Sequence, residues 1–364
     1  MTVPIPDATA EAAVVDRVAS FQRRAPRLHD DVVTLAHGAG GKASAALLES
    51  VFLPAFGTGP LAHQTDAALL ASPAGDQLAF TTDSFVVQPL RFPGGSVGDL
   101  AVNGTINDLA VMGAEPLGLS AAFVLEEGFP IVELRALVDD MAAAASAAGV
   151  AVLTGDTKVV GHGAADGVYI TTAGIGRVPA GRHLDAGQVE PGDAVLVSGT
   201  IADHGMAVML ARGDLALTAD IRSDTAALAT LVDALLAAAP DTRWMRDATR
   251  GGVGTVVNEL ARAADLAIVL DESALPIRPE VAGACEMLGI DPLHVANEGK
   301  LVAVVPGERA DDALGALHAH PLGHDAACIG TVRPDPPGLA VLATAFGGTR
   351  ILDVLVGDPL PRIC

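Results

Sequence analysis

The chain has 364 residues, which is long enough for two domains with full cores, and half of them are hydrophobic. Its 44 acidic and 22 basic residues give a net charge of −22, which opposes nonspecific binding to nucleic acid or to an anionic membrane. Phosphate groups could bind to such a chain only with metal ions between them and the carboxylates.

The cysteine pattern is typical of a reducing compartment. Cys285, Cys328 and Cys364 form no C-x-x-C pair and leave one cysteine over, and the first two are expected to be small core residues. The start of the chain has no basic segment before an apolar run, so we predict no signal peptide. The longest uncharged apolar stretch, residues 141–154, is too short to cross a bilayer. These features predict a cytoplasmic protein.

Residues 1–30 are predicted to be an N-terminal extension with one amphipathic helix over residues 8–24. A strand is expected at residues 32–36 and a helix at residues 43–51, joined by the glycine-rich turn His37-Gly38-Ala39-Gly40-Gly41-Lys42. Such a turn before a helix offers backbone N–H groups to an anion. It is not a Walker A loop, because alanines stand where the first Gly and the Ser/Thr belong. A phosphate contact and a simple tight turn are equally good interpretations.

Three aspartates of the first half lie beside predicted strands. Asp66 precedes a short strand, Asp83 follows the next one, and Asp156 follows a strand over residues 150–153, with Lys158 two positions on. Ligands of α/β proteins gather where strands end. Any one of these aspartates is more often a cap or turn residue, but the recurrence favours a binding site.

A long helix predicted over residues 97–112 carries polar residues in an otherwise apolar sequence. Asn103 and Asn107 share a face, and Asp108 follows them. Buried polar groups need partners, so these residues are equally consistent with a binding site and a structural network. Mg²⁺ in proteins is usually bound by a few carboxylates together with phosphate oxygens. A set of four aspartates is therefore predicted to hold Mg²⁺ and a triphosphate: Asp66, Asp83, Asp108 and Asp156.

The remaining segments complete two α/β domains. In the first, strands are predicted at residues 78–82, 114–126 and 169–176, and a helix at 131–148. A Gly/Pro-rich stretch at residues 179–191 marks the boundary. In the second, strands are predicted at 194–198, 301–305 and 328–332, and helices at 226–239, 281–288 and 310–319.

Two motifs carry polar groups in the second half. The segment Arg246-Asp247-Ala248-Thr249-Arg250-Gly251-Gly252 leads into a helix through Ala264, which gives a second helix start that can meet an anion. Glu298 lies in the turn Asn297-Glu298-Gly299-Lys300, where spacing alone favours a surface charge.

The sequence ends in Pro359-Leu360-Pro361-Arg362-Ile363-Cys364. Each proline lacks an N–H and pushes the residue before it away from helix, so we expect an extended arm with Gly357 as its hinge. A thiol on such an arm could visit another protein and return to a pocket in its own. Composition alone favours a frayed terminus with an incidental cysteine.

The chain therefore contains, in order, Thr82-Asp83-Ser84, Gly104-Thr105-Ile106-Asn107-Asp108-Leu109-Ala110, Thr154-Gly155-Asp156-Thr157-Lys158, Arg246 to Gly252, Ala296-Asn297-Glu298-Gly299-Lys300 and Pro-Arg-Ile-Cys. In this order they resemble the HypE family of hydrogenase maturation factors, in the superfamily of aminoimidazole ribonucleotide synthetase and selenophosphate synthetase. The resemblance covers about residues 35–364, and the terminal segment selects HypE within the superfamily. Asn103 departs from the pattern, since a small or thiol residue is expected there.

The resemblance implies an α/β fold of two PurM-like domains, with the N-terminal sheets of two protomers pairing into a barrel across a homodimer. An ATP-binding domain would span residues 31–180 and a second α/β domain residues 181–350. A mobile tail, residues 351–364, would carry Cys364.

The resemblance also implies the chemistry. A partner resembling HypF would place a carbamoyl group on Cys364, and the chain would dehydrate it to a thiocyanate with ATP and Mg²⁺. The cyanide would pass to iron on a HypC–HypD complex, as a ligand for the NiFe hydrogenase centre. Lys158 and Glu298 would flank Cys364 as catalytic residues. The four aspartates would hold Mg²⁺ and ATP, with further ATP contacts from His37, Gly38, Gly40, Gly41, Lys42, Asn107 and Asp247.

Two other functions remain open from the residues. Phosphorylation of a free small molecule, as in the wider superfamily, would leave the cysteine tail unused. A thiol carrier or scaffold without catalysis would leave the acidic residues and the glycine-rich turn unused. ATP hydrolysis that depends on Cys364 would separate the three.

Overall fold

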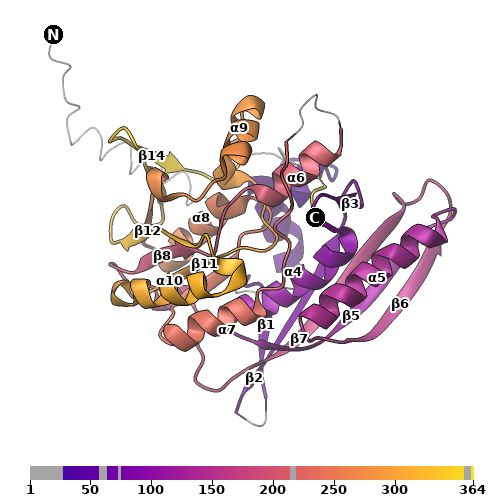
Figure 1. Cartoon of the computed structure of the whole chain (residues 1–364), viewed down its shortest axis with the longest axis horizontal. Coiled ribbons are helices and arrows are strands. Elements are labelled where there is room, and N and C mark those ends of the chain that lie inside the picture. The colour runs from indigo at the N-terminus through magenta and orange to yellow at the C-terminus, as the bar shows by residue number, and fades with distance from the viewer. Residues whose placement is uncertain (1–27, 57–63, 73–74, 214–218, 356–361) are drawn as a thin grey trace.

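The computed structural model describes residues 28–56, 64–72, 75–213, 219–355 and 362–364. The helix predicted at residues 8–24 and the predicted hinge and prolines of the tail lie outside the described residues. Two mixed sheets lie side by side, and the chain passes from one to the other between Val178 and Ala194 (Figure 1). Within the described ranges, no helix combines the length and apolar character needed to cross a membrane.

The first half of the chain forms a five-stranded sheet in the order β1-β2-β7-β5-β6. Its strands are β1 (Ala68–Ala71), β2 (Gln77–Phe85), β5 (Glu115–Glu126), β6 (Val152–Val160) and β7 (Val168–Val178). Neighbours are antiparallel except β5 and β6, which run parallel. A small hairpin follows β2 and consists of β3 (Arg91–Phe92) and β4 (Gly95–Ser96).

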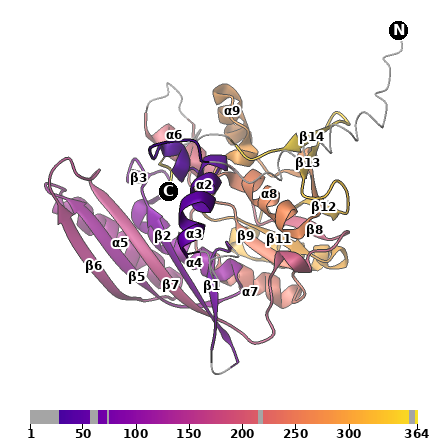
Figure 2. The same ribbon diagram turned by 180° about the vertical axis from the view of Figure 1, so that it is seen from behind.

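Two helices, α4 (Val97–Val111) and α5 (Ile131–Ala147), cover one face of this sheet, and much of the other face is open in Figure 2. Ser96 begins α4, because its Oγ accepts a hydrogen bond from Gly98 N at 3.2 Å. A Cβ at Gly98 would lie 2.4 Å from Leu137 O, so glycine allows α4 to pack closely on α5.

The second half forms a seven-stranded sheet in the order β14-β13-β10-β12-β8-β11-β9. Its strands are β8 (Ala194–Val197), β9 (Trp244–Asp247), β10 (Ala267–Asp271), β11 (Leu301–Val305), β12 (Ala327–Arg333), β13 (Ala340–Ala343) and β14 (Thr349–Leu352). Its helices are α6 (Asp203–Ala211), α7 (Ala229–Ala238), α8 (Gly252–Ala264), α9 (Pro279–Leu288) and α10 (Ala310–Ala319). Every residue of β8 and β11 is buried, because alternate side chains enter two different hydrophobic cores.

Most predicted elements are confirmed within a few residues, including α4, α5, β5, β7, β8 and β11. The strand predicted at residues 32–36 is wrong, since Leu35–Gly38 forms a 3-10 turn in which His37 Nδ1 accepts from Thr34 N at 2.9 Å. The helix after it begins with α2 (Lys42–Leu47) and continues through a π turn into α3 (Leu53–Phe56). The elements that were not predicted include β3, β4, α6, β9, β10, β13 and β14.

Two predicted strand ends are also wrong, and both carry aspartates. The strand predicted to end at residue 153 continues to Val160, so Asp156 lies in the middle of β6. Similarly, β2 continues to Phe85, so Asp83 lies within the strand. Asp83 and Asp156 therefore do not owe their positions to the ends of strands.

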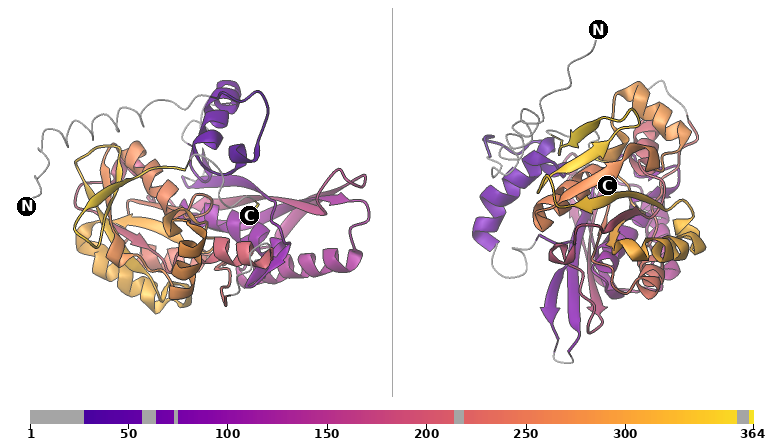
Figure 3. Two further views of the ribbon diagram at one scale, coloured as in Figure 1. Left: turned by 90° about the horizontal axis from the view of Figure 1, so that it is seen from above. Right: turned by 90° about the vertical axis from the view of Figure 1, so that its left-hand side faces the viewer.

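The two halves meet along α4. This helix packs against the first sheet and also against α7 and β9 of the second half. Asn107 Nδ2 donates to Ala226 O at 3.0 Å and to Glu298 O at 3.1 Å, and its Oδ1 accepts from Leu228 N at 2.8 Å. The end of the chain, labelled C in Figure 3, lies at the junction of the two halves.

Candidate active site

Three carboxylates from distant parts of the chain meet near the end of α4. Asp66 precedes β1, Asp108 lies on α4 and Asp247 ends β9, and one oxygen of each lies within 4.8 Å of the others. We call this group the carboxylate triad. Burial, followed by repulsion between the carboxylates, raises the pKa of Asp108 well above its ordinary value and that of Asp247 to about 8.

The triad fits Mg²⁺, which prefers oxygen ligands. Its crowded negative charge is only partly balanced by Arg246, whose Nε lies 2.9 Å from Asp66 Oδ1. Asp83, predicted as a metal ligand, lies near enough to raise the pKa of Asp108 and Asp247 but is not part of the triad. Asp247, predicted as an ATP contact only, is part of it.

The thiol of Cys364 lies beside a second acidic group. Burial raises the pKa of this thiol well above its ordinary value, Glu298 and Asp83 raise it further, and Arg250 opposes them. The pKa of Glu298 is also raised well above its ordinary value, first by burial and then by Asp83. Glu298 Oε1 is buried, and no described residue offers it a hydrogen bond. A neutral thiol is thus held against a carboxyl group that favours its protonated form.

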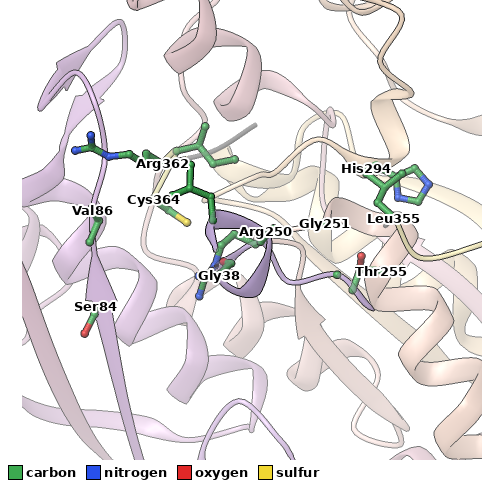
Figure 4. A pocket seen from close by; sticks show the side chains of 14 residues that line it. Gly38, Ser84, Val86, Arg250, Gly251, Thr255, His294, Leu355, Arg362 and Cys364 are labelled. Carbon is green, nitrogen blue, oxygen red and sulfur yellow. Dashed lines mark hydrogen bonds between the residues drawn. The ribbon is translucent and has the colours of Figure 1, made fainter. Parts of the chain in front are cut away.

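A pocket of about 240 Å³ lies next to this thiol, and both glycine-rich segments line it (Figure 4). Gly38 belongs to the first segment and Gly251 to the second. Arg250 joins them, because its Nη1 donates to Gly38 O at 2.8 Å and its backbone O would lie 3.1 Å from a Cβ at Gly40. The two helix starts predicted to meet an anion therefore face one pocket beside Cys364.

The side chains of the first glycine-rich turn are engaged elsewhere. Of the predicted ATP contacts in this turn, Gly41 lines the pocket but His37 and Lys42 do not. Lys42 Nζ pairs with Asp353 Oδ2 at 2.6 Å, and Lys42 N donates to Leu355 O at 3.2 Å. This turn is therefore bonded to the base of the tail.

Asp156 and Lys158 are not brought to this site within one chain. Both are exposed on β6, the outer strand of the first sheet, and their side chains pair with each other at 2.6 Å. A Cβ at Gly155 would lie 2.2 Å from Ala121 O, so this glycine permits close strand pairing and does not mark a turn. Within the described residues of one chain, these two side chains therefore do not lie beside the other aspartates or beside Cys364, although this was predicted.

Asn107, predicted to contact ATP, is used inside the protein. Its amide reaches from the first half to three backbone groups of the second half and fixes the backbone of Glu298. Asp224 Oδ1 accepts from Glu298 N at 3.0 Å and holds the same residue from the other side. The structural network left open by the sequence is thus present, and it positions Glu298.

Sequence reasoning gave no role to several residues of the site. Arg246 and Arg250 stand on either side of Asp247 in a chain with few cations, and this was a usable signal. His204, whose Nε2 lies 2.6 Å from Ile363 O, left no signal because the helix that carries it was not predicted.

Comparison with known proteins identifies the family of the chain. The model of the N-terminal domain of AIR synthase related proteins matches residues 64–178, and that of their C-terminal domain matches residues 190–341. The carbamoyl dehydratase HypE of Rhodobacter capsulatus is 55% identical over 340 residues, which cover 93% of this chain and 99% of that relative.

Two crystal structures extend the likeness to three dimensions. A HypE–HypF complex matches with a TM-score of 0.81 and 45% identity, covering 85% of this chain and 100% of that chain. A HypE structure in complex with ATP matches with a TM-score of 0.76 and 42% identity, covering 92% of this chain and 100% of that chain. The chain belongs to the HypE carbamoyl dehydratase family.

Proposed function

We propose that this chain uses ATP to convert a carbamoyl group on Cys364 into a thiocyanate. The observation that carries the proposal is the position of the Cys364 thiol, which adjoins both the acidic pair Asp83 and Glu298 and the pocket lined by the two glycine-rich segments. The relatives are carbamoyl dehydratases, which supports dehydration as the reaction. A similar HypE structure is in complex with ATP, which supports ATP as the nucleotide.

The reaction removes one water from S–C(=O)–NH₂ and leaves S–C≡N. Because an amide oxygen leaves poorly, it first attacks the γ-phosphorus of ATP, ADP departs, and one N–H proton is lost. The second N–H proton is then lost as the C–O bond breaks, and the carbamoyl oxygen leaves in phosphate. The products are the thiocyanate, ADP and phosphate, and two nitrogen protons need an acceptor.

We assign the acceptance of these protons to Glu298. Its raised pKa makes the ionised carboxylate a stronger base than an exposed glutamate. Burial favours the protonated form, and a protonated Glu298 must lose its proton before it can accept one. Arg250 lowers the pKa of Glu298 and is the cation that favours this ionised form.

The carboxylate triad would hold Mg²⁺, which would neutralise the charge of the triphosphate. The proposal rests on three buried or half-buried oxygens within 4.8 Å of one another in a chain whose net charge is −22. Arg246 and Arg250 supply the positive charge that the chain itself brings to this region.

The proposed partners follow from the chemistry of the carrier thiol. A HypF-type carbamoyltransferase would load Cys364, in line with the HypE–HypF complex of a similar protein. A HypC–HypD complex that carries iron would accept the cyanide. We place both steps in the cytoplasm, and the three free cysteines support a reducing compartment.

We also propose a homodimer that buries the open face of the first sheet. That face exposes Phe80 (47%), Leu117 (52%) and Leu153 (66%), and β6 forms an edge of the described sheet. Pairing with the same face of a second copy would cover these side chains. It would also carry Asp156 and Lys158 of β6 toward the site of the other subunit.

Intact mass spectrometry tests the reaction. Protein loaded by a HypF-type transferase should lose the mass of one water when MgATP is added, and should keep it without ATP. Peptide mapping should place the modification on Cys364, and Cys364→Ser should stay unloaded. A carbamoyl group on Cys285 or Cys328, or a loaded Cys364 that keeps its mass with MgATP, would contradict the proposal.

A further inference from the structure

The end of the tail is held by groups that do not face the thiol. Residues 362–364 run antiparallel to residues 86–88, which continue the chain beyond β2. Val86 N donates to Cys364 O at 3.0 Å, and Gln88 N donates to Arg362 O at 3.1 Å. Figure 4 shows Arg362 and Cys364 beside the strand that carries Ser84 and Val86. The tail thus adds a short strand to this edge, a mode of binding that uses main-chain hydrogen bonds.

A histidine of the second half holds the carbonyl between these two bonds. His204 Nε2 lies 2.6 Å from Ile363 O, and since a carbonyl only accepts, Nε2 carries the proton. His204 Nδ1 then accepts from Ser223 Oγ at 2.8 Å. The ring is fully buried and packs edge-on against Phe92, so its donor has a fixed direction.

An arginine after α6 holds both strands of this pairing. Arg212 Nε donates to Gln88 O at 2.8 Å, and Arg212 Nη2 donates to Arg362 O at 2.8 Å. The carbonyl of Arg362 therefore receives two donors, one from each half of the protein. Docking of the tail depends on both halves.

Within residues 362–364, the side chains of Ile363 and Arg362 also contact the rest of the protein. Ile363 is 5% exposed and joins the hydrophobic core of the first half. Arg362 forms an ion pair with Asp166, which lies in the turn between β6 and β7. The other contacts are made to the backbone of residues 362–364, so they can form whatever group the thiol carries.

We propose that residues 86–88, His204 and Arg212 form a docking site for residues 362–364 that sets how much of the time the carrier thiol spends beside Glu298. The proposal rests on the proposed function and adds positioning residues to it. None of these groups acts on the reacting atoms. Weaker docking exposes the thiol more often, which favours loading by a partner, and strong loss of docking leaves less carrier in place for dehydration.

Alkylation of Cys364 by iodoacetamide in the full chain measures the undocked fraction. His204→Leu and Arg212→Ala each remove donors to the tail, so each should raise the alkylation rate about three- to tenfold. His204→Gln keeps an N–H near the position of Nε2 and should stay close to wild type. The double variant His204→Leu/Arg212→Ala should raise the rate further, load faster with carbamoyl and dehydrate more slowly.

Cys285 provides an internal control, because it is 1% exposed in the core and reacts only when the fold opens. Faster alkylation of Cys364 with unchanged Cys285 supports the docking site. Equal Cys364 rates in wild type and in all variants, or a parallel rise at Cys285, would overturn it. A wild-type protein that fails to lose water with MgATP would refute the proposed function alone, because the alkylation rates report docking without any reaction.

Discussion

Asp247→Asn should make the metal-free protein more stable, and the gain at pH 9 should be about twice the gain at pH 6. Burial, followed by repulsion from Asp66, raises the pKa of Asp247 from 3.8 to about 8. Above about pH 4 the unfolded chain releases this proton while the folded chain keeps it. The free energy of unfolding therefore falls as the pH rises through this window and levels off above about pH 8. Asparagine has no proton to lose.

The size of the effect follows from the two pKa values. Each pH unit between them costs about 1.4 kcal/mol, so the interval from 3.8 to about 8 corresponds to about 6 kcal/mol at most. Asp66 and Asp108 share part of this repulsion, so we expect about half of it, about 3 kcal/mol, from one substitution. For a chain of 364 residues this raises the melting temperature by about 4 °C.

Thermal melts in EDTA at pH 6 and pH 9, repeated with MgCl₂, measure the effect. Mg²⁺ should raise the melting temperature of the wild type at pH 9 and leave Asp247→Asn almost unchanged. Asp139→Asn is the matched control, since it makes the same change at a residue that is exposed on α5. It should alter neither value.

Equal melting temperatures for wild type and Asp247→Asn at pH 9 would refute the reasoning, because they would show no repulsion to relieve. A loss of the Mg²⁺ response in Asp139→Asn would also contradict it. That result would show that the response does not depend on the carboxylate triad.

Glu298→Gln should keep carbamoyl loading but slow the loss of water about 10²- to 10⁴-fold, because a general base is removed; intact mass followed over time shows it. Asn107→Ala should lower the free energy of unfolding by about 1–3 kcal/mol in urea titrations, because Leu228 N and Glu298 O lose a buried partner; unchanged stability would argue against the network. If Lys158 serves the other subunit of a dimer, mixing inactive Lys158→Ala and Cys364→Ser chains should restore dehydration on the intact Cys364. No restoration would place Lys158 in the site of its own chain.

Much of the fold was predictable from the sequence because its long elements carry local signals. The helix α4 follows a serine cap and an apolar run, and β8 and β11 are uninterrupted runs of valine, alanine and leucine. The four-residue strands β13 and β14 have too little pattern of their own, and they form because partner strands are present. The segment at residues 32–36 has the β-branched residues of a strand, but it lies outside both sheets.

The site was predictable where its chemistry is local and unpredictable where it depends on tertiary contacts. Glycines before helix starts indicated two anion-binding segments, but not that they share a pocket. Spacing favoured a surface charge at Glu298, yet the residue is 3% exposed because Asn107 and Asp224 draw its backbone between the two halves. The grouping of Asp247, rather than Asp156, with the other carboxylates required the second half of the chain to be in place.

The anchoring of the tail at both ends has a consequence for how tightly the carrier must be bound. Leu355 is bonded to Lys42 and Arg362 to Gln88, so only residues 356–361 separate one anchor from the other. A short tether of this kind holds its end at an effective concentration on the order of millimolar. A docking site with only millimolar affinity would therefore be occupied about half of the time. The tethered thiol can therefore dock often enough to react and still dissociate quickly from the docking site. The same three residues, offered as a free peptide, would scarcely bind.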